Sequence, residues 1–99
     1  MKYRIESDTL GEVKIPEKSL WGPQTQRSIE NFKIGKPNSM PIEIIKAYSI
    51  LKKSCAKANY ESKILDSKKM KLISQACDEI LEGIHDDEFP LVIWQTGSG

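Results

Sequence analysis

The sequence predicts a mainly α-helical chain that begins with a small β-hairpin, continues with a short helix and then forms an antiparallel αα-hairpin. Two segments near the N-terminus alternate apolar with charged residues, which is the period of a half-buried strand. Two longer segments in the second half repeat apolar residues every three or four positions, which is the period of a helix. A short polar link joins those two helices, and short links favour antiparallel neighbours.

The predicted hairpin has strands at residues 3–6 and 12–15, separated by the turn-forming sequence Ser-Asp-Thr-Leu-Gly at 7–11. Pro16 ends the second strand, because proline has no N–H to donate to a sheet. An isolated two-stranded hairpin is only marginally stable in water. We therefore expect its apolar side chains to pack on another element: Tyr3, Ile5, Val13 and Ile15.

A short helix is predicted from about Pro23 to Phe32. Proline suits the first turn of a helix, where its missing N–H has no intrahelical partner to lose. The apolar stripe is thin, with Ile29 and Phe32, and the start is unusually polar, with Gln-Thr-Gln-Arg at residues 24–27. Glycine, proline and Asn-Ser at 35–39 then indicate a loop.

The two long helices are predicted at about Pro41–Lys63 and Lys68–Ile84, with Asp66 or Ser67 as the cap of the second. The first carries an apolar stripe of Ile44, Ala47, Leu51, Cys55 and Ala58, and the second one of Met70, Ile73, Cys77, Ile80, Leu81 and Ile84. Because both cysteines lie on these stripes and have no C-x-x-C spacing, we expect buried free thiols. Other apolar side chains lie outside the stripes. Either they form an interface, or the N-terminal third covers them.

Composition excludes several classes of function. Fifteen Lys and Arg against fourteen Asp and Glu give a net charge of +1, which offers no bulk field for nucleic acid or an anionic membrane. No apolar run approaches the roughly 18 residues of a membrane span, and the N-terminus has no signal-peptide core. We therefore expect a soluble intracellular protein without a nucleic-acid or membrane partner.

The most informative segment is the end of the chain, where apolar residues 91–94 open into a loop of small residues, Thr96 to Gly99. Glycine lets a ligand approach the backbone closely, and backbone N–H groups with Thr and Ser hydroxyls are suited to an anion. Gly-Ser-Gly is equally the composition of a flexible linker. His85 with Asp86 and Asp87 is open to two interpretations, an acid–base or metal cluster or a solvated loop.

Three segments together resemble the N-terminal region of class II fumarate hydratases, in the fumarase/aspartase superfamily: residues 4–13, residues 20–32, and residues 85–99 with His-Asp-Asp-Glu-Phe-Pro running into Ile-Trp-Gln-Thr-Gly-Ser-Gly. Aspartate ammonia-lyases share the layout but usually differ at Gln24-Thr25-Gln26 and at Trp94–Gly97, where this chain follows the fumarase pattern. The resemblance implies that residues 1–99 are the N-terminal domain of a fumarase-like lyase, truncated within its substrate-binding loop.

The resemblance implies reversible hydration of fumarate to (S)-malate in the tricarboxylic acid cycle, by a homotetramer of the cytoplasm or, in a eukaryote, the mitochondrial matrix. No metal or other cofactor is implied. Ser98 and Gly99 match the loop that contacts a carboxylate of the small dicarboxylate substrate, and Thr96 supports that loop. For Thr25 and Arg27 a supporting role stands beside ordinary helix N-terminal bonding.

The family's catalytic residues lie beyond Gly99, so the 99-residue chain is expected to be inactive, and His85 is interpreted as structural. Two alternative functions remain from the sequence. One is an aspartate ammonia-lyase-type enzyme with the same fold. The other is a stand-alone helical protein-interaction module, which the αα-hairpin and the surplus apolar side chains would suit.

Overall fold

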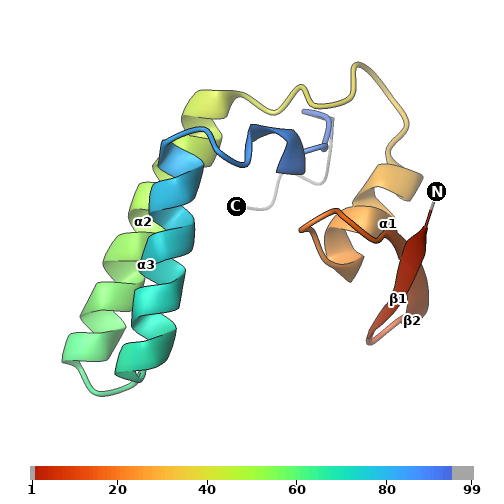
Figure 1. Ribbon diagram of the computed structural model, residues 1–99. Helices are drawn as coiled ribbons and strands as arrows, with labels where there is room; N and C mark the ends of the chain where they lie inside the picture. Colours follow the sequence, from red (N-terminus) through yellow and green to blue (C-terminus); the bar gives the residue numbers. More distant parts are fainter. Residues whose placement is uncertain (1, 95–99) are drawn as a thin grey trace. The chain divides into compact units, whose positions relative to one another are not determined.

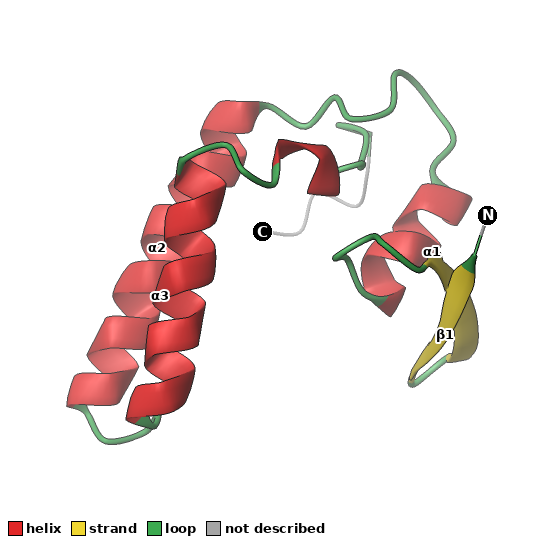
Figure 2. Cartoon of the chain, in the orientation of Figure 1, coloured by secondary structure: helices red, strands yellow, loops and turns green. Residues whose placement is uncertain are grey.

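The computed structural model describes residues 2–94 and divides the chain into two compact units (Figure 1). Unit 1 contains residues 2–40 together with 87–94, and unit 2 contains residues 41–86. Within the described range, the order of elements is a two-stranded hairpin, a short helix, two long helices and one turn of 3-10 helix at Asp86–Glu88 (Figure 2). The predicted fold class is confirmed.

Strands β1 (Tyr3–Asp8) and β2 (Gly11–Pro16) pair antiparallel, from Tyr3 opposite Pro16 to Asp8 opposite Gly11. The strands run further toward the turn than predicted. The reason is a tight connection through Thr9 and Leu10, in which the Leu10 N–H donates to Asp8 Oδ1 at 2.9 Å. Gly11 leaves the turn at φ +115°, a conformation that glycine adopts without steric cost.

Only one strand of the hairpin contributes apolar side chains to the core of unit 1. Val13 and Ile15 are buried, Ile15 completely, as predicted. The same prediction was wrong for Tyr3 and Ile5, which are 55% and 61% exposed. The register explains this difference, because residues directly opposite each other share a face of a sheet. Ile15 lies opposite Arg4, so the face that packs against α1 carries the polar residues of β1.

Helix α1 (Pro23–Asn31) begins at the predicted proline and contains no fully buried residue. Its N-cap, Gly22, makes no side-chain capping bond. A helix this short gains little stability from its own hydrogen bonds, so its position depends on contacts with neighbouring elements.

The segment after the 3-10 helix is held in unit 1 by the loop that follows α1. The N–H groups of Asn38 and Ser39 donate to the carbonyls of Pro90 and Leu91 at 3.1 and 3.2 Å. The Ile93 N–H donates in turn to Ser39 Oγ at 3.3 Å. The chain is therefore anchored by backbone hydrogen bonds a few residues before its terminal loop.

Unit 2 is an αα-hairpin of α2 (Ile42–Glu61) and α3 (Ser67–Leu81), which lie side by side (Figure 1). Asp66 caps α3 by accepting a hydrogen bond from the Lys69 N–H at 2.8 Å, as one of the two predicted caps. Helix α3 ends at Leu81 and not at Ile84, because Gly83 adopts φ +84° and the Ile84 N–H turns back to the Glu79 carbonyl at 3.1 Å.

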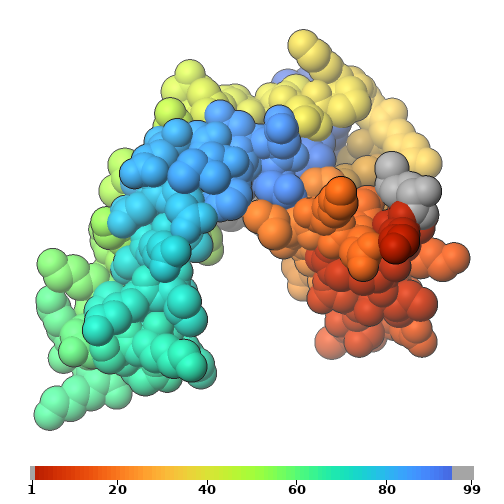
Figure 3. Space-filling view, in the orientation of Figure 1, coloured from red at the N-terminus to blue at the C-terminus, as the bar shows by residue number. Residues whose placement is uncertain are grey.

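The contact between the two helices is made by a different face of α2 from the predicted stripe. The buried positions of α2 are Ser49 and Ala56, whose small side chains suit close packing on α3. The predicted stripe lies on another side of the helix, where Ile44 and Leu51 are 46% and 55% exposed. In the space-filling view of Figure 3, the atoms of α3 (cyan) lie against those of α2 (green) and cover part of them.

The two cysteines consequently differ in environment. Both are free thiols, but Cys77 is buried between the helices, as predicted, and Cys55 is exposed. The prediction of a buried thiol was wrong for Cys55, because it belongs to the α2 stripe that does not face α3.

Candidate functional site

The residues expected to contact substrate, Ser98 and Gly99, and the supporting Thr96 lie outside the described residues. Their roles stay predictions. The described chain approaches them through residues 90–94, anchored as above. Gly35 lies against the last described side chain of this segment, since a Cβ placed there would be 3.0 Å from Trp94 Cδ1. Only glycine leaves room for the indole at that distance.

Arg27 projects from α1 to the hairpin turn and holds it at three points. Its Nε and Nη2 donate to Asp8 Oδ2 and Oδ1, each at 2.8 Å, and Nη2 also donates to the Gly11 carbonyl at 2.9 Å. The parallel pair of bonds is the fork geometry that only arginine offers a carboxylate. The guanidinium of Arg27 lowers the pKa of Asp8, and the Asp8 carboxylate raises the pKa of Arg27. Both groups are therefore charged over the whole physiological pH range.

Thr25 and Arg27 line a pocket of about 430 Å³ in unit 1. Its wall also includes the hairpin turn at Asp8 and Thr9, the start of α1 at Gln24, and Leu91. This volume is within the usual range for small-molecule sites. The structure thus brings the polar start of α1 next to the segment that leads to the terminal loop, two regions that the sequence had singled out separately.

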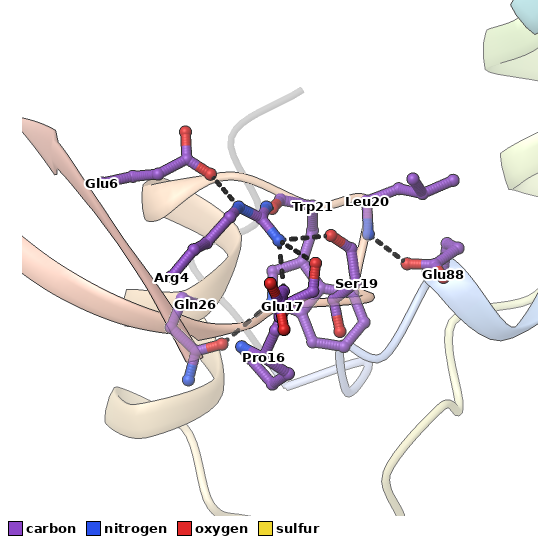
Figure 4. A network of polar contacts seen from close by, with 9 residues as sticks. All are labelled: Arg4, Glu6, Pro16, Glu17, Ser19, Leu20, Trp21, Gln26 and Glu88. Carbon is purple, nitrogen blue, oxygen red and sulfur yellow. Dashed lines mark hydrogen bonds and ion pairs between the residues drawn. The ribbon is translucent and has the colours of Figure 1, made fainter. Parts of the chain in front are cut away.

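A second polar network fixes the chain between β2 and α1 (Figure 4). Arg4 donates from Nη1 to the carbonyls of Pro16 and Ser19 at 3.0 and 2.6 Å, and from Nη2 to the Trp21 carbonyl at 2.7 Å. Its Nε donates to Glu6. A single guanidinium therefore satisfies several carbonyls of a connection that has no regular structure of its own.

Two further bonds tie this connection to its neighbours in unit 1. The Leu20 N–H donates to Glu88 Oε2 at 2.7 Å, and Trp21 Nε1 donates to Gln26 Oε1 at 2.9 Å (Figure 4). Sequence reasoning missed Arg4 and Asp8 as organising residues. The available signal was that Arg4 and Asp8 share one face of an alternating strand. The sequence alone does not say which face of that strand packs against the rest of the chain.

His85 belongs to unit 2 and contacts the last turns of α3. Its Nε2 lies 2.7 Å from Glu79 Oε1, and Gln75 Nε2 donates to Glu79 Oε2 at 3.0 Å. These two hydrogen bonds, chiefly the one from His85, lower the pKa of Glu79. Among residues 2–94 no group of three His, Cys, Asp or Glu side chains is arranged to hold a metal ion.

No helix in the described part of the chain is long and apolar enough to cross a membrane.

Comparison with known proteins decides the family. The sequence profile of the Lyase family matches residues 11–99. The chain belongs to the Lyase family. Class II fumarate hydratases of Bacillus subtilis and Pasteurella multocida are 57% and 58% identical to it over 99 residues, which is all of this chain and 21% of each relative. The chain thus spans about a fifth of the length of these relatives.

Solved structures agree with this assignment. A class II fumarase from Schistosoma mansoni matches 99% of this lyase chain with a TM-score of 0.94 and 39% identity, over 21% of its own length. The structure described as fumarate lyase:delta crystallin from Brucella melitensis bound to cobalt matches 99% of the chain with a TM-score of 0.89 and 35% identity, over 22% of its length. Both the predicted family and the predicted fold of its N-terminal region are confirmed.

Proposed function

We propose that this chain is part of a fumarate hydratase, an enzyme that adds water reversibly to fumarate to give (S)-malate. The observation that carries the proposal is the 57–58% identity, over the whole chain, to relatives named class II fumarate hydratase. Two stretches favour this reaction over ammonia release from aspartate: Gln24-Thr25-Gln26 and Trp94-Gln95-Thr96-Gly97 follow the fumarase pattern.

The chemical difficulty is the removal of a weakly acidic proton from the carbon next to a carboxylate. The resulting aci-carboxylate carries additional negative charge, and donors fixed around it lower the barrier by electrostatic preorganisation. The Ser98 hydroxyl is the donor of this chain, and Gly99 permits close approach of the backbone to the substrate carboxylate. Thr96 shapes the loop, while Thr25 and Arg27 support the site from α1.

The groups that transfer protons belong to parts of the enzyme outside these residues, so the 99-residue chain alone should not convert malate to fumarate. The full protein would act in the tricarboxylic acid cycle as a homotetramer, in the cytoplasm or the mitochondrial matrix, with a small dicarboxylate as its ligand and without a cofactor. Such an assembly would offer a partner surface for the exposed apolar side chains of α2, such as Ile44 and Leu51.

The role of Ser98 is tested in the full-length enzyme by Ser98→Ala. Loss of a hydrogen bond to a charged carboxylate costs about 1.5–3 kcal/mol, so kcat/KM should fall roughly 10- to 150-fold. Ser54→Ala is the matched control, because Ser54 is exposed in α2 and its hydroxyl donates to the Ile50 carbonyl of the same helix at 2.9 Å. An unchanged kcat/KM in Ser98→Ala would remove Ser98 from the site.

The reaction itself is tested by assaying the same enzyme with malate and with aspartate. Fumarate formation from malate, without ammonia release from aspartate, is the expected result. Ammonia release at a rate equal to malate turnover would replace the proposal with an aspartate ammonia-lyase.

A further inference from the structure

We propose that Asp8 and Arg27 are a pair of positioning residues for the lyase active site. They hold the hairpin turn and the start of α1 in the relative position that the site requires, and they do not themselves touch the substrate. This inference rests on the proposed function. Its starting point is the three-bond contact of one guanidinium with both ends of a two-residue turn.

The geometry of the pair fixes orientation as well as distance. Two parallel bonds from Arg27 to the Asp8 carboxylate prevent rotation of one group against the other. The third bond, to the Gly11 carbonyl, ties the same side chain to the other end of the turn. A lysine at this position would keep the charge but would offer a point charge in place of the planar fork.

Helix α1 packs on the hairpin, and the Arg27–Asp8 pair is the contact that ties its side chains to the hairpin turn. It has no fully buried side chain and no side-chain N-cap. The side chains of Arg27 and Asp8 are 23% and 15% exposed, so their hydrogen bonds are partly shielded from competing water. Breaking the pair would therefore let α1 shift relative to the hairpin without unfolding the α2–α3 hairpin, which shares no residue with unit 1.

The pair also lies where a shift of α1 would affect the site. Asp8 and Arg27 line the 430 Å³ pocket together with Thr25 and Leu91. Leu91 belongs to the anchored segment that leads to the terminal loop, and its carbonyl accepts the Ser39 N–H at 3.2 Å. Displacement of a supporting wall by an ångström is enough to misalign groups that act in a transition state.

The test compares Arg27→Lys, Arg27→Met and Asp8→Asn in the full-length enzyme, with kcat, KM and the unfolding midpoint measured for each. We expect kcat to fall about tenfold in Arg27→Lys and up to about 100-fold in Arg27→Met, in the order of hydrogen bonds lost, with KM changed less than kcat. The double variant Arg27→Met with Asp8→Asn should be no worse than Arg27→Met alone, because each residue acts through the other.

Asp78→Asn is the control, since it breaks the exposed Lys53–Asp78 pair of unit 2 and should leave kcat unchanged. An unaltered kcat per folded active site in Arg27→Met would overturn the proposal, as would an effect confined to KM. Failure of the proposed function is a separate result: the wild-type enzyme would then not turn over malate. If it released ammonia from aspartate, the same variants would be ranked on that reaction.

Discussion

Arg27 in unit 1 and Lys53 in unit 2 each pair with an aspartate from another element, but the two pairs differ in geometry. Arg27 makes a fork with Asp8, whose side chain is 15% exposed. Lys53 makes one bond to Asp78 at 2.6 Å, and both side chains are more than 40% exposed. Exposed single ion pairs add little to stability. The comparison indicates that unit 1 combines a small apolar core around Ile15 with partly shielded polar contacts, whereas the exposed ion pair of unit 2 adds little to its helix packing.

The two units also differ in how far apart in the sequence the partners of their backbone hydrogen bonds lie. In unit 2 both long helices end in the same local motif, in which two N–H groups beyond the helix turn back to carbonyls of its last turn. In unit 1 the key bonds join residues far apart in the sequence, such as the Leu20 N–H with Glu88. Unit 2 is therefore specified locally, and unit 1 requires several distant segments to be present together.

The strongest test of this difference between the units is to truncate Ile15, which is completely buried in the described part of unit 1. Ile15→Ala should destabilise that unit by about 3 kcal/mol, because it removes buried methyl groups and leaves a cavity. Hydrogen exchange should accelerate for the amides of β1, β2 and α1 and stay unchanged for α2 and α3. Equal acceleration in both units would mean that they unfold as one, and the division would be broken.

Two substitutions, one after α2 and one after α3, test how the helix ends contribute to the stability of unit 2. Lys63 and Gly83 occupy equivalent positions, with φ +64° and +84°, but only Gly83 is suited to a positive φ. Lys63→Gly should stabilise unit 2 by about 0.5–1 kcal/mol, and Gly83→Ala should destabilise it by about 1 kcal/mol. In Gly83→Ala the new Cβ would also lie 3.3 Å from Asp86 Oδ2.

Denaturant unfolding measures both effects, with Gly22→Ala as a control outside unit 2. Gly22 has a negative φ of −103°, and a Cβ there meets nothing within 4 Å, so this variant should leave the stability of unit 2 unchanged and only weaken the N-cap of α1. If Lys63→Gly lost stability, the end of α2 would not be under the strain that its dihedral angle indicates.

The smallest expected effect is a pH dependence carried by Glu79. Its pKa is lowered in the folded chain, first by the bond with His85 and then by that with Gln75. The resulting stability is fully present above the ordinary pKa of 4.5 and is lost as the pH falls through the lower folded value. Glu79→Gln should therefore flatten the acid limb of a stability curve for unit 2, and an identical limb in both proteins would contradict the assignment.

The sequence predicted elements well where one local rule governed them. Pro23 begins α1 and Asp66 caps α3 because each effect depends on a few neighbouring residues. The periodicity of α2 was also correct, but periodicity identifies an apolar stripe without identifying its partner. The α2 stripe faces away from α3, and the contact falls instead on small residues such as Ala56.

The candidate site was predictable only in part, for a related reason. Thr25 and Arg27 were named from a resemblance, yet the partner of Arg27 is Asp8, nineteen positions earlier in the chain. Which of two strand faces meets a helix depends on register, and composition does not encode it. Ser98, Gly99 and Thr96 lie outside the described residues, so their roles stay predictions.

The unequal exposure of the two cysteines has a practical consequence. A thiol reagent added to the 99-residue chain should label Cys55 at once, because that thiol is exposed. Cys77 is 5% exposed between α2 and α3, so its labelling must wait until the helices separate. The ratio of the two labelling rates would then measure how often the helical hairpin opens, with Cys55 as the internal reference and without any mutation.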